Sequence, residues 1–156
     1  MINKHTHAEP HYLVRFSFDP NSVAMANGDS HIILGGYSGS TIALRVEFGY
    51  STGGYQILAG LVDDGSTWTE TDWFPLSDAS HLLQFDWRSA SGAGANNGGL
   101  VLWRDGVQQQ LVAGIDNDTR RMERVLLGAL AGIDTATRGT YYFDAFESKR
   151  QTYIGP

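Results

Sequence analysis

The chain has 156 residues, a net charge of −6, 42% hydrophobic residues and no cysteine. This length suits one domain with a substantial core, and the composition excludes a disordered chain, disulfides and cysteine-based metal or catalytic sites. The lack of clustered Lys and Arg argues against a nucleic-acid partner, and the lack of a long apolar run argues against membrane insertion.

Residues 1–11 are polar and lack an apolar core, so we expect a flexible tail there. In the following residues, apolar and polar side chains alternate between turns rich in Gly, Asn and Asp, which is the pattern of half-buried strands. Successive side chains of a strand point to opposite faces, so one face of each segment is apolar. This pattern predicts strands at residues 12–18, 31–35, 42–48, 55–61 and 67–74.

The clearest stretch spans residues 80–106 and has the sequence SHLLQFDWRSASGAGANNGGLVLWRDG. It predicts a strand at residues 82–88, a mobile loop at 89–99, a strand at 100–104 and a returning strand at 107–112. Asp105-Gly106 suits the two-residue turn between the last two strands, because both positions tolerate positive φ. Residues 125–127 and 141–147 predict two more strands, while residues 118–130 have weak helical periodicity.

About ten short strands separated by turns predict one all-β domain at residues 12–150, followed by a C-terminal tail at residues 151–156. Each predicted strand has an apolar face and a polar face. Two antiparallel sheets that share one core would bury all the apolar faces. We therefore predict a two-sheet antiparallel sandwich.

Three segments carry a resemblance to a known fold: SHLLQFDW, GGLVLWRDG and the closing YYFDAFESKR. An alternating strand after a histidine, a loop, and a strand that ends in Asp-Gly resemble the laminin G-like, concanavalin A-like jelly-roll domains of bacterial extracellular proteins. His81 matches the histidine of this pattern, whereas Ser80 stands where the family has tryptophan. The resemblance implies a jelly roll in a larger secreted or cell-surface protein. Domains of this group bind glycans or mediate adhesion, and calcium at a sheet rim is frequent among them.

A glycan presents apolar ring faces bordered by hydroxyls, so its binding site needs exposed aromatic side chains beside polar groups. Trp103 is the first candidate, because Leu102 should face the core and Trp103 the opposite side. Trp68 is the second candidate and Tyr37 the third. The alternative for Trp103 is packing beneath a neighbouring loop. Trp73 should lie on the other face of the strand that holds Trp68.

Catalysis by this fold has its own pattern. The resemblance extends to laminarinase-type glycosidases, which carry Glu-x-Asp-x-x-Glu on one strand, where carboxylates serve as nucleophile and acid/base. Glu70 and Asp72 begin this pattern, but Pro75 occupies its third position. We therefore expect no catalytic residues and no enzyme activity, and we interpret both carboxylates as solvent-facing.

Calcium binds to several oxygen ligands, often carboxylates together with backbone carbonyls. Asp116 and Asp118, in the polar loop at residues 114–121, are the predicted ligands of a structural Ca²⁺. Asp63 and Asp64 are the second choice. Polar loops of sandwiches also hold such residues without a metal, which is the alternative.

These features favour a non-catalytic carbohydrate-binding or adhesion module, monomeric within a larger extracellular or cell-surface chain. Its expected partner is a glycan or a cell-surface polymer. One alternative is a structural spacer domain that interacts with other proteins. Another is a glycoside hydrolase or lyase of the same fold, for which the sequence offers less support.

Overall fold

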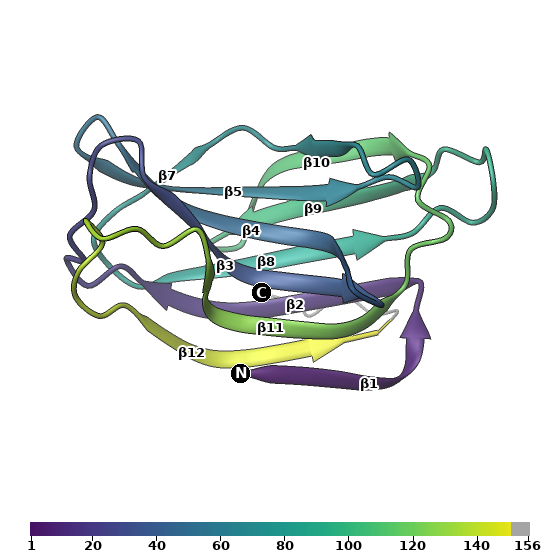
Figure 1. The fold of residues 1–156 in the computed structure, drawn as a ribbon, viewed down its shortest axis with the longest axis horizontal. Coiled ribbons are helices and arrows are strands. Elements are labelled where there is room, and N and C mark those ends of the chain that lie inside the picture. Colours follow the sequence, from purple (N-terminus) through teal and green to yellow (C-terminus); the bar gives the residue numbers. More distant parts are fainter. Residues whose placement is uncertain (151–156) are drawn as a thin grey trace.

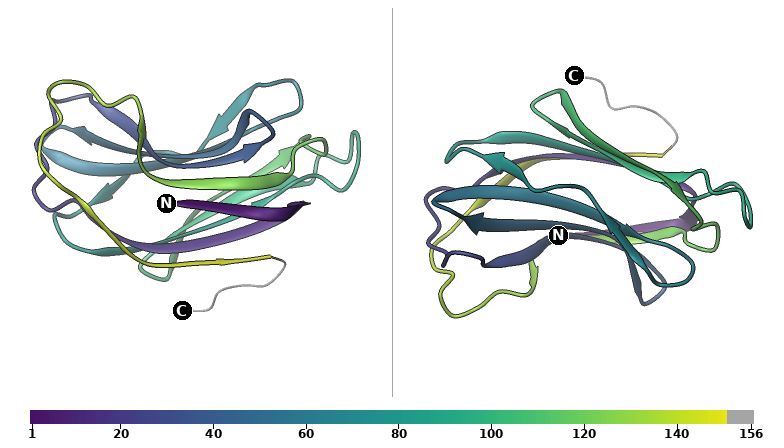
Figure 2. Two further views of the ribbon diagram at one scale, coloured as in Figure 1. Left: turned by 60° about the horizontal axis from the view of Figure 1, so that its bottom comes forward. Right: turned by 90° about the horizontal axis from the view of Figure 1, so that it is seen from above.

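The structure is a computed structural model that describes residues 1–150. The side chains of residues 3–7 and the tail expected at residues 151–156 lie outside the described residues. Two antiparallel sheets lie face to face and enclose one core, as Figure 2 shows. The prediction of an all-β, two-sheet antiparallel sandwich is confirmed. Within residues 1–150 there is no helix of the length and apolarity needed to cross a bilayer.

The larger sheet has seven strands, and Figure 1 labels most of them. Its order is β1 (Ile2–Glu9), β11 (Met122–Ala131), β3 (Ser30–Ser38), β4 (Thr41–Ser51), β5 (Gly54–Val62) and β6 (Trp68–Glu70), with β7 (Phe74–Leu76) also paired to β5. The smaller sheet has five strands. Its order is β10 (Val107–Ile115), β9 (Gly98–Arg104), β8 (His81–Arg88), β2 (His11–Asp19) and β12 (Tyr142–Lys149).

The inward faces of the strands form the core that the alternation predicts. Phe16, Phe85 and Trp87 are fully buried, and so is Leu102, which confirms that these residues face inward. Burial of one such side chain stabilises the fold by about 1.5–3 kcal/mol. The rings of Phe18 on β2 and Phe48 on β4 meet with centroids 4.8 Å apart and join the two sheets through the core.

The structure differs from the sequence-based expectation in three elements. Residues 2–9, expected to be a tail, form β1, which pairs with β11 at the edge of the larger sheet. The strand expected at residues 67–74 is two short strands, β6 and β7, separated by residues 71–73. The strand expected at residues 125–127 is the ten-residue β11, which rules out a helix at that place.

Candidate functional site

Three glycines lie on the outer face of the larger sheet, at its centre. Gly35 of β3 and Gly60 of β5 are the direct neighbours of Arg45 on β4, one on each side. Gly49 lies four residues further along β4. Because Leu44, Val46 and Phe48 of β4 belong to the core, the alternating positions 45, 47 and 49 face outward. On this outer face, the backbone on both sides of Arg45 therefore carries no side chains.

An aromatic ring covers each of these glycines. A Cβ atom at Gly35 would lie 3.1 Å from Cε2 of Tyr37, and one at Gly49 would lie 3.1 Å from Cη2 of Trp73. A Cβ atom at Gly60 would lie 3.3 Å from Cε3 of Trp68. The three rings thus rest closely against the sheet.

The spacing of the rings follows from the strand geometry. Gly35 and Gly60 are two strand spacings apart, about 10 Å, and Gly49 lies about 13 Å along β4 from Arg45. Trp73 is 36% exposed, whereas the rings of Tyr37 and Trp68 are half-buried. The rings therefore cover an area wide enough for an extended ligand.

Arg45 lies between the rings and connects them to two carboxylates. Its guanidinium carbon is 4.1 Å from the centroid of the Trp68 ring. Its Nε lies 2.9 Å from Oε1 of Glu47, and its Nη2 contacts Glu70. The Nε–H has no hydrogen-bond acceptor among the described residues, although the distance to Glu47 is short. We take the short distance as an ion pair whose N–H is not directed at the carboxylate, which leaves one donor of Arg45 unused.

Arg124 repeats this arrangement on β11. Its guanidinium carbon lies 4.5 Å from the centroid of the Tyr37 ring. Its Nε is buried and, within residues 1–150, has no hydrogen-bond acceptor. A cation over an aromatic ring is stabilised by the ring quadrupole. The Nε–H of Arg124 is closed off from solvent, so only the outer N–H groups of this guanidinium can reach a ligand.

We call this surface the aromatic face. It comprises Tyr37, Arg45, Glu47, Trp68, Glu70, Trp73 and Arg124. It presents aromatic rings for stacking, guanidinium donors and carboxylate acceptors within one surface. These are the groups that bind a molecule with apolar ring faces and hydroxyl edges.

The aromatic face brings together two of the residues expected to bind carbohydrate, Trp68 and Tyr37. Trp73 lies there as well, so the expectation that it faces away from Trp68 is wrong. The chain leaves the sheet at residues 71–73, and this break resets the alternation. The sequence analysis missed Arg45, Glu47 and Arg124. The signal that could have found them is a charged residue repeated at outward positions beside glycines.

Trp103 lies on a different surface. It pairs with Gln84 of β8 and Gln108 of β10, on the outer face of the smaller sheet. Leu102 beside it is fully buried, so the expected register of this strand is confirmed. The sandwich separates Trp103 from Trp68 and Tyr37, and these three residues cannot share one site. Carbohydrate binding by Trp103 stays a prediction.

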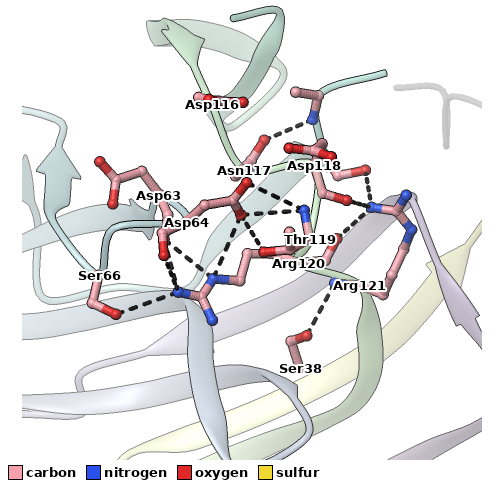
Figure 3. Close-up of polar contacts among 12 residues, drawn as sticks. Ser38, Asp63, Asp64, Ser66, Asp116, Asn117, Asp118, Thr119, Arg120 and Arg121 are labelled. Atoms are coloured by element: carbon pink, nitrogen blue, oxygen red, sulfur yellow. Dashed lines mark hydrogen bonds and ion pairs between the residues drawn. The ribbon is translucent and has the colours of Figure 1, made fainter. Parts of the chain in front are cut away.

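The expected calcium ligands lie at one end of the sandwich, where two loops meet (Figure 3). Asp64, from the β5–β6 loop, and Asp116 and Asp118, from the β10–β11 loop, bring carboxylate oxygens within 4.8 Å of one another. Oxygens bound to one Ca²⁺ at 2.3–2.6 Å lie at most about 5 Å apart, so this spacing fits the ion. The structure therefore brings together one residue of the second choice with both residues of the first.

Contacts within the loops hold this cluster. Hydrogen bonds from Thr119 and Asp118 outweigh the effect of burial and keep the pKa of Asp64 below its usual value. The hydrogen bond with Asp64 raises the pKa of Asp118, and desolvation and the nearby charges of Asp64 and Asp116 act in the same direction. Asn117 between them is fully buried and anchors the loop by accepting from the Ala90 N–H at 2.7 Å. The three carboxylates therefore lie close enough to repel one another.

A serine, a histidine and an aspartate also meet where β8 begins. Nε2 of His81 lies 2.9 Å from the hydroxyl of Ser77, and its Nδ1 lies 2.7 Å from Asp105. The backbone N–H of Ser77 also donates to Nε2, at 3.1 Å. Because a neutral imidazole has one lone pair there, this bond competes with proton transfer from the hydroxyl. We interpret the group as a link between the β7–β8 loop and the β9–β10 turn.

No protein-family model matches the chain, and no curated protein matches it. Several solved structures do match. One is an alginate lyase, with a TM-score of 0.66 and 11% sequence identity, over 96% of this chain and 74% of that one. Another is a family 18 polysaccharide lyase, with a TM-score of 0.60 and 10% identity, over 92% of this chain and 73% of that one.

Two further matches are a toxin domain and a pentraxin. The receptor-binding domain of botulinum neurotoxin mosaic serotype C/D has a TM-score of 0.63 and 9% identity. This chain covers 34% of that structure's length, with 92% of its own residues aligned. A heptameric pentraxin from Limulus polyphemus has a TM-score of 0.52 and 10% identity. Identities this low show a shared fold, and that fold is the jelly-roll type of β-sandwich.

The comparisons correct one expectation. We expected that the chain is not an enzyme, partly because it lacks the glycosidase motif. Two of the matched structures are polysaccharide lyases. They contradict the expectation, because this fold carries catalysis on polysaccharides. Absence of the Glu-x-Asp-x-x-Glu pattern therefore does not exclude an activity.

Proposed function

We propose that the domain binds carbohydrate through the aromatic face. The observation that carries the proposal is that three aromatic rings and both signs of charge lie on one outer sheet surface. Aromatic rings bury the apolar faces of sugar rings, and the guanidinium and carboxylate groups bind the hydroxyls around them. The match to polysaccharide lyases supports a carbohydrate ligand in general, whereas the charge of that ligand is argued from the residues of the aromatic face.

The wider role follows from the fold and the resemblance. We propose an extracellular or cell-surface location in a longer chain, where the domain attaches its neighbours to a glycan or takes part in adhesion. A closer relation to the laminin G-like group belongs to this proposal. The sandwich itself supports these roles because its rigid sheets hold the binding residues in place.

Binding to a panel of soluble polysaccharides tests the proposal, with affinity measured by calorimetry. Trp73→Ala should weaken binding by about tenfold or more, because an exposed ring contributes to ligand stacking more than to folding. Trp103→Ala is the matched control on the opposite sheet and should change affinity less than about twofold. Loss of binding in Trp103→Ala with retention in Trp73→Ala would place the site on the smaller sheet.

A second candidate function is cleavage of the bound polysaccharide. Glu47 and Glu70 both contact Arg45 on the aromatic face, so two carboxylates lie close together beside the aromatic rings. Glycosidases use such a pair as acid and nucleophile or base. Release of new reducing ends would reveal turnover. If the pair is catalytic, Glu70→Gln should abolish turnover and keep binding. Turnover that persists in Glu70→Gln would exclude this role.

We also propose that Asp64, Asp116 and Asp118 bind a structural Ca²⁺. The support is the spacing of their oxygens, because a divalent cation between them would neutralise their mutual repulsion. Backbone carbonyls of the two loops and water would complete the coordination. Such an ion would connect the β5–β6 and β10–β11 loops next to the Trp68 end of the aromatic face.

A further inference from the structure

The charges on the aromatic face bear on the kind of glycan that it binds. Arg45 contacts two carboxylates, those of Glu47 and Glu70, so this group of three has a net charge of about −1 at neutral pH. The charge of Arg124 balances that excess. The contacts that define the face therefore include no surplus of positive charge.

The surroundings of the face are acidic. The cluster of Asp64, Asp116 and Asp118 lies at the end of β5, next to the β6 strand that holds Trp68. The whole chain has a net charge of −6. Proteins that bind polyanions use an excess of Lys and Arg to attract them. Arg120 offsets one carboxylate of the cluster, so without a bound cation the remaining field disfavours a polymer of uronic acids, and a bound Ca²⁺ would weaken that effect.

The hydrogen-bonding groups of the face fit a neutral partner. A carboxylate only accepts and a guanidinium only donates, whereas a sugar hydroxyl does both. Hydroxyls can therefore donate to the carboxylates of Glu47 and Glu70 and accept from the outer N–H groups of the two guanidinium groups. A ligand carboxylate would satisfy the arginines but leave the two glutamates opposed by a like charge.

We infer that the ligand of the aromatic face is a neutral, polyhydroxylated glycan, and that the face discriminates against uronate polymers. This inference rests on the proposed carbohydrate-binding function. Glu47 and Glu70 are the residues that determine the specificity. They accept hydrogen bonds from the neutral sugar and exclude the carboxylated one.

The test uses pairs of oligosaccharides with the same linkage. The two members of a pair differ only at C6 of each sugar, which is a hydroxymethyl group in one and a carboxylate in the other. A hexamer of β-1,4-mannose and a hexamer of β-1,4-mannuronate form one pair, and β-1,4-glucose and β-1,4-glucuronate hexamers form another. Affinities are measured by calorimetry at low ionic strength, in calcium-free buffer and again with millimolar calcium. The neutral member of a bound pair should bind at least about tenfold more tightly than its uronate.

Substitutions assign this preference to the carboxylates. Glu70→Gln and Glu47→Gln should each raise the affinity for the uronate by about threefold or more, because each removes one nearby like charge. Glu147→Gln is the control, since Glu147 pairs with Arg15 on the smaller sheet and its loss changes the net charge equally. It should leave the preference unchanged.

The possible outcomes distinguish the inferred preference for neutral glycans from the proposed carbohydrate-binding function. The inference is supported if the ratio of the affinity for the neutral hexamer to that for its uronate decreases in Glu70→Gln but not in Glu147→Gln. Uronates that bind as tightly as their neutral partners overturn the inference and leave carbohydrate binding in place. If no member of any pair binds, the carbohydrate-binding function fails and the inference fails with it.

Discussion

His31 is a buried histidine whose environment opposes its charged form. The residue is 2% exposed, its Nε2 lies 3.0 Å from the hydroxyl of Tyr141, and its Nδ1 has no partner among the residues described. Burial lowers the pKa of His31, although the carboxylate of Asp134 acts in the opposite direction. In the unfolded chain the imidazole binds a proton more readily. Stability should therefore fall as pH decreases through the ordinary value of 6.5.

His31→Phe removes this titration. We expect the midpoint of urea unfolding to decrease more steeply for the native chain than for His31→Phe between pH 7 and pH 5. The variant also loses the hydrogen bond to Tyr141, so the slopes with pH are compared and not the absolute midpoints. Equal slopes would show that His31 takes up no proton on unfolding in this range.

Thr71 determines how the chain passes from β6 to β7. Its hydroxyl accepts a hydrogen bond from the Ala59 N–H at 3.1 Å and donates one to the Asp72 carbonyl at 2.9 Å. The Thr71 N–H still donates to the Ala59 carbonyl at 2.8 Å, so the side chain replaces only the backbone acceptor, and the chain leaves the ladder after Thr71 until Phe74. This detour is what brings Trp73 onto the same face as Trp68.

Thr71→Val keeps the shape of the side chain and removes its hydroxyl. The N–H of Ala59 then lacks an acceptor in a buried position, so the free energy of unfolding should fall by about 1–3 kcal/mol. Thr71→Ser retains the hydroxyl, so its free energy of unfolding should fall by less than about 1 kcal/mol. Urea unfolding measures both. Equal losses of unfolding free energy in the two variants would show that the hydroxyl does not stabilise the interruption between β6 and β7.

The β5–β6 and β10–β11 loops meet at one end of the sandwich, and calcium bound between them should stabilise the fold. If Asp64, Asp116 and Asp118 bind the ion in the native state alone, added calcium should stabilise the fold by about 2.7 kcal/mol at a hundredfold excess over the dissociation constant. The melting temperature should rise accordingly. Asp116→Ala should remove the response, and Asp144→Ala, on the smaller sheet, should keep it. An unchanged melting curve of the native chain at millimolar calcium would exclude the site.

At the scale of the whole molecule, the sequence predicts the sandwich because alternation is a local property. The strands around Phe16, Trp87 and Leu102 bury their apolar faces regardless of which strand lies beside them. The aromatic face depends instead on pairing between strands far apart in sequence. Arg45 faces Gly35 and Gly60 only after β3, β4 and β5 are in register, and no local pattern specifies that register.

The acidic cluster illustrates the same limit. Asp64 and Asp116 are each visible as residues of a polar loop, yet their meeting follows from the end of the sandwich that each loop occupies. The edge strand β1 is a third case. Its residues are polar, and it forms because β11 offers an unpaired edge, with the N-terminal amine donating to the Leu127 carbonyl at 2.7 Å.

The four tryptophans allow the most direct test of carbohydrate binding by the aromatic face. Each gives one indole N–H signal in a ¹H–¹⁵N correlation spectrum, and single Trp→Phe variants assign them. On titration with a binding oligosaccharide, we predict that the signals of Trp68 and Trp73 shift, because a ligand on this face lies against both rings. The signals of Trp87, which is fully buried, and of Trp103, on the opposite sheet, should stay in place. A shift of the Trp103 signal with Trp68 and Trp73 unchanged would contradict the account.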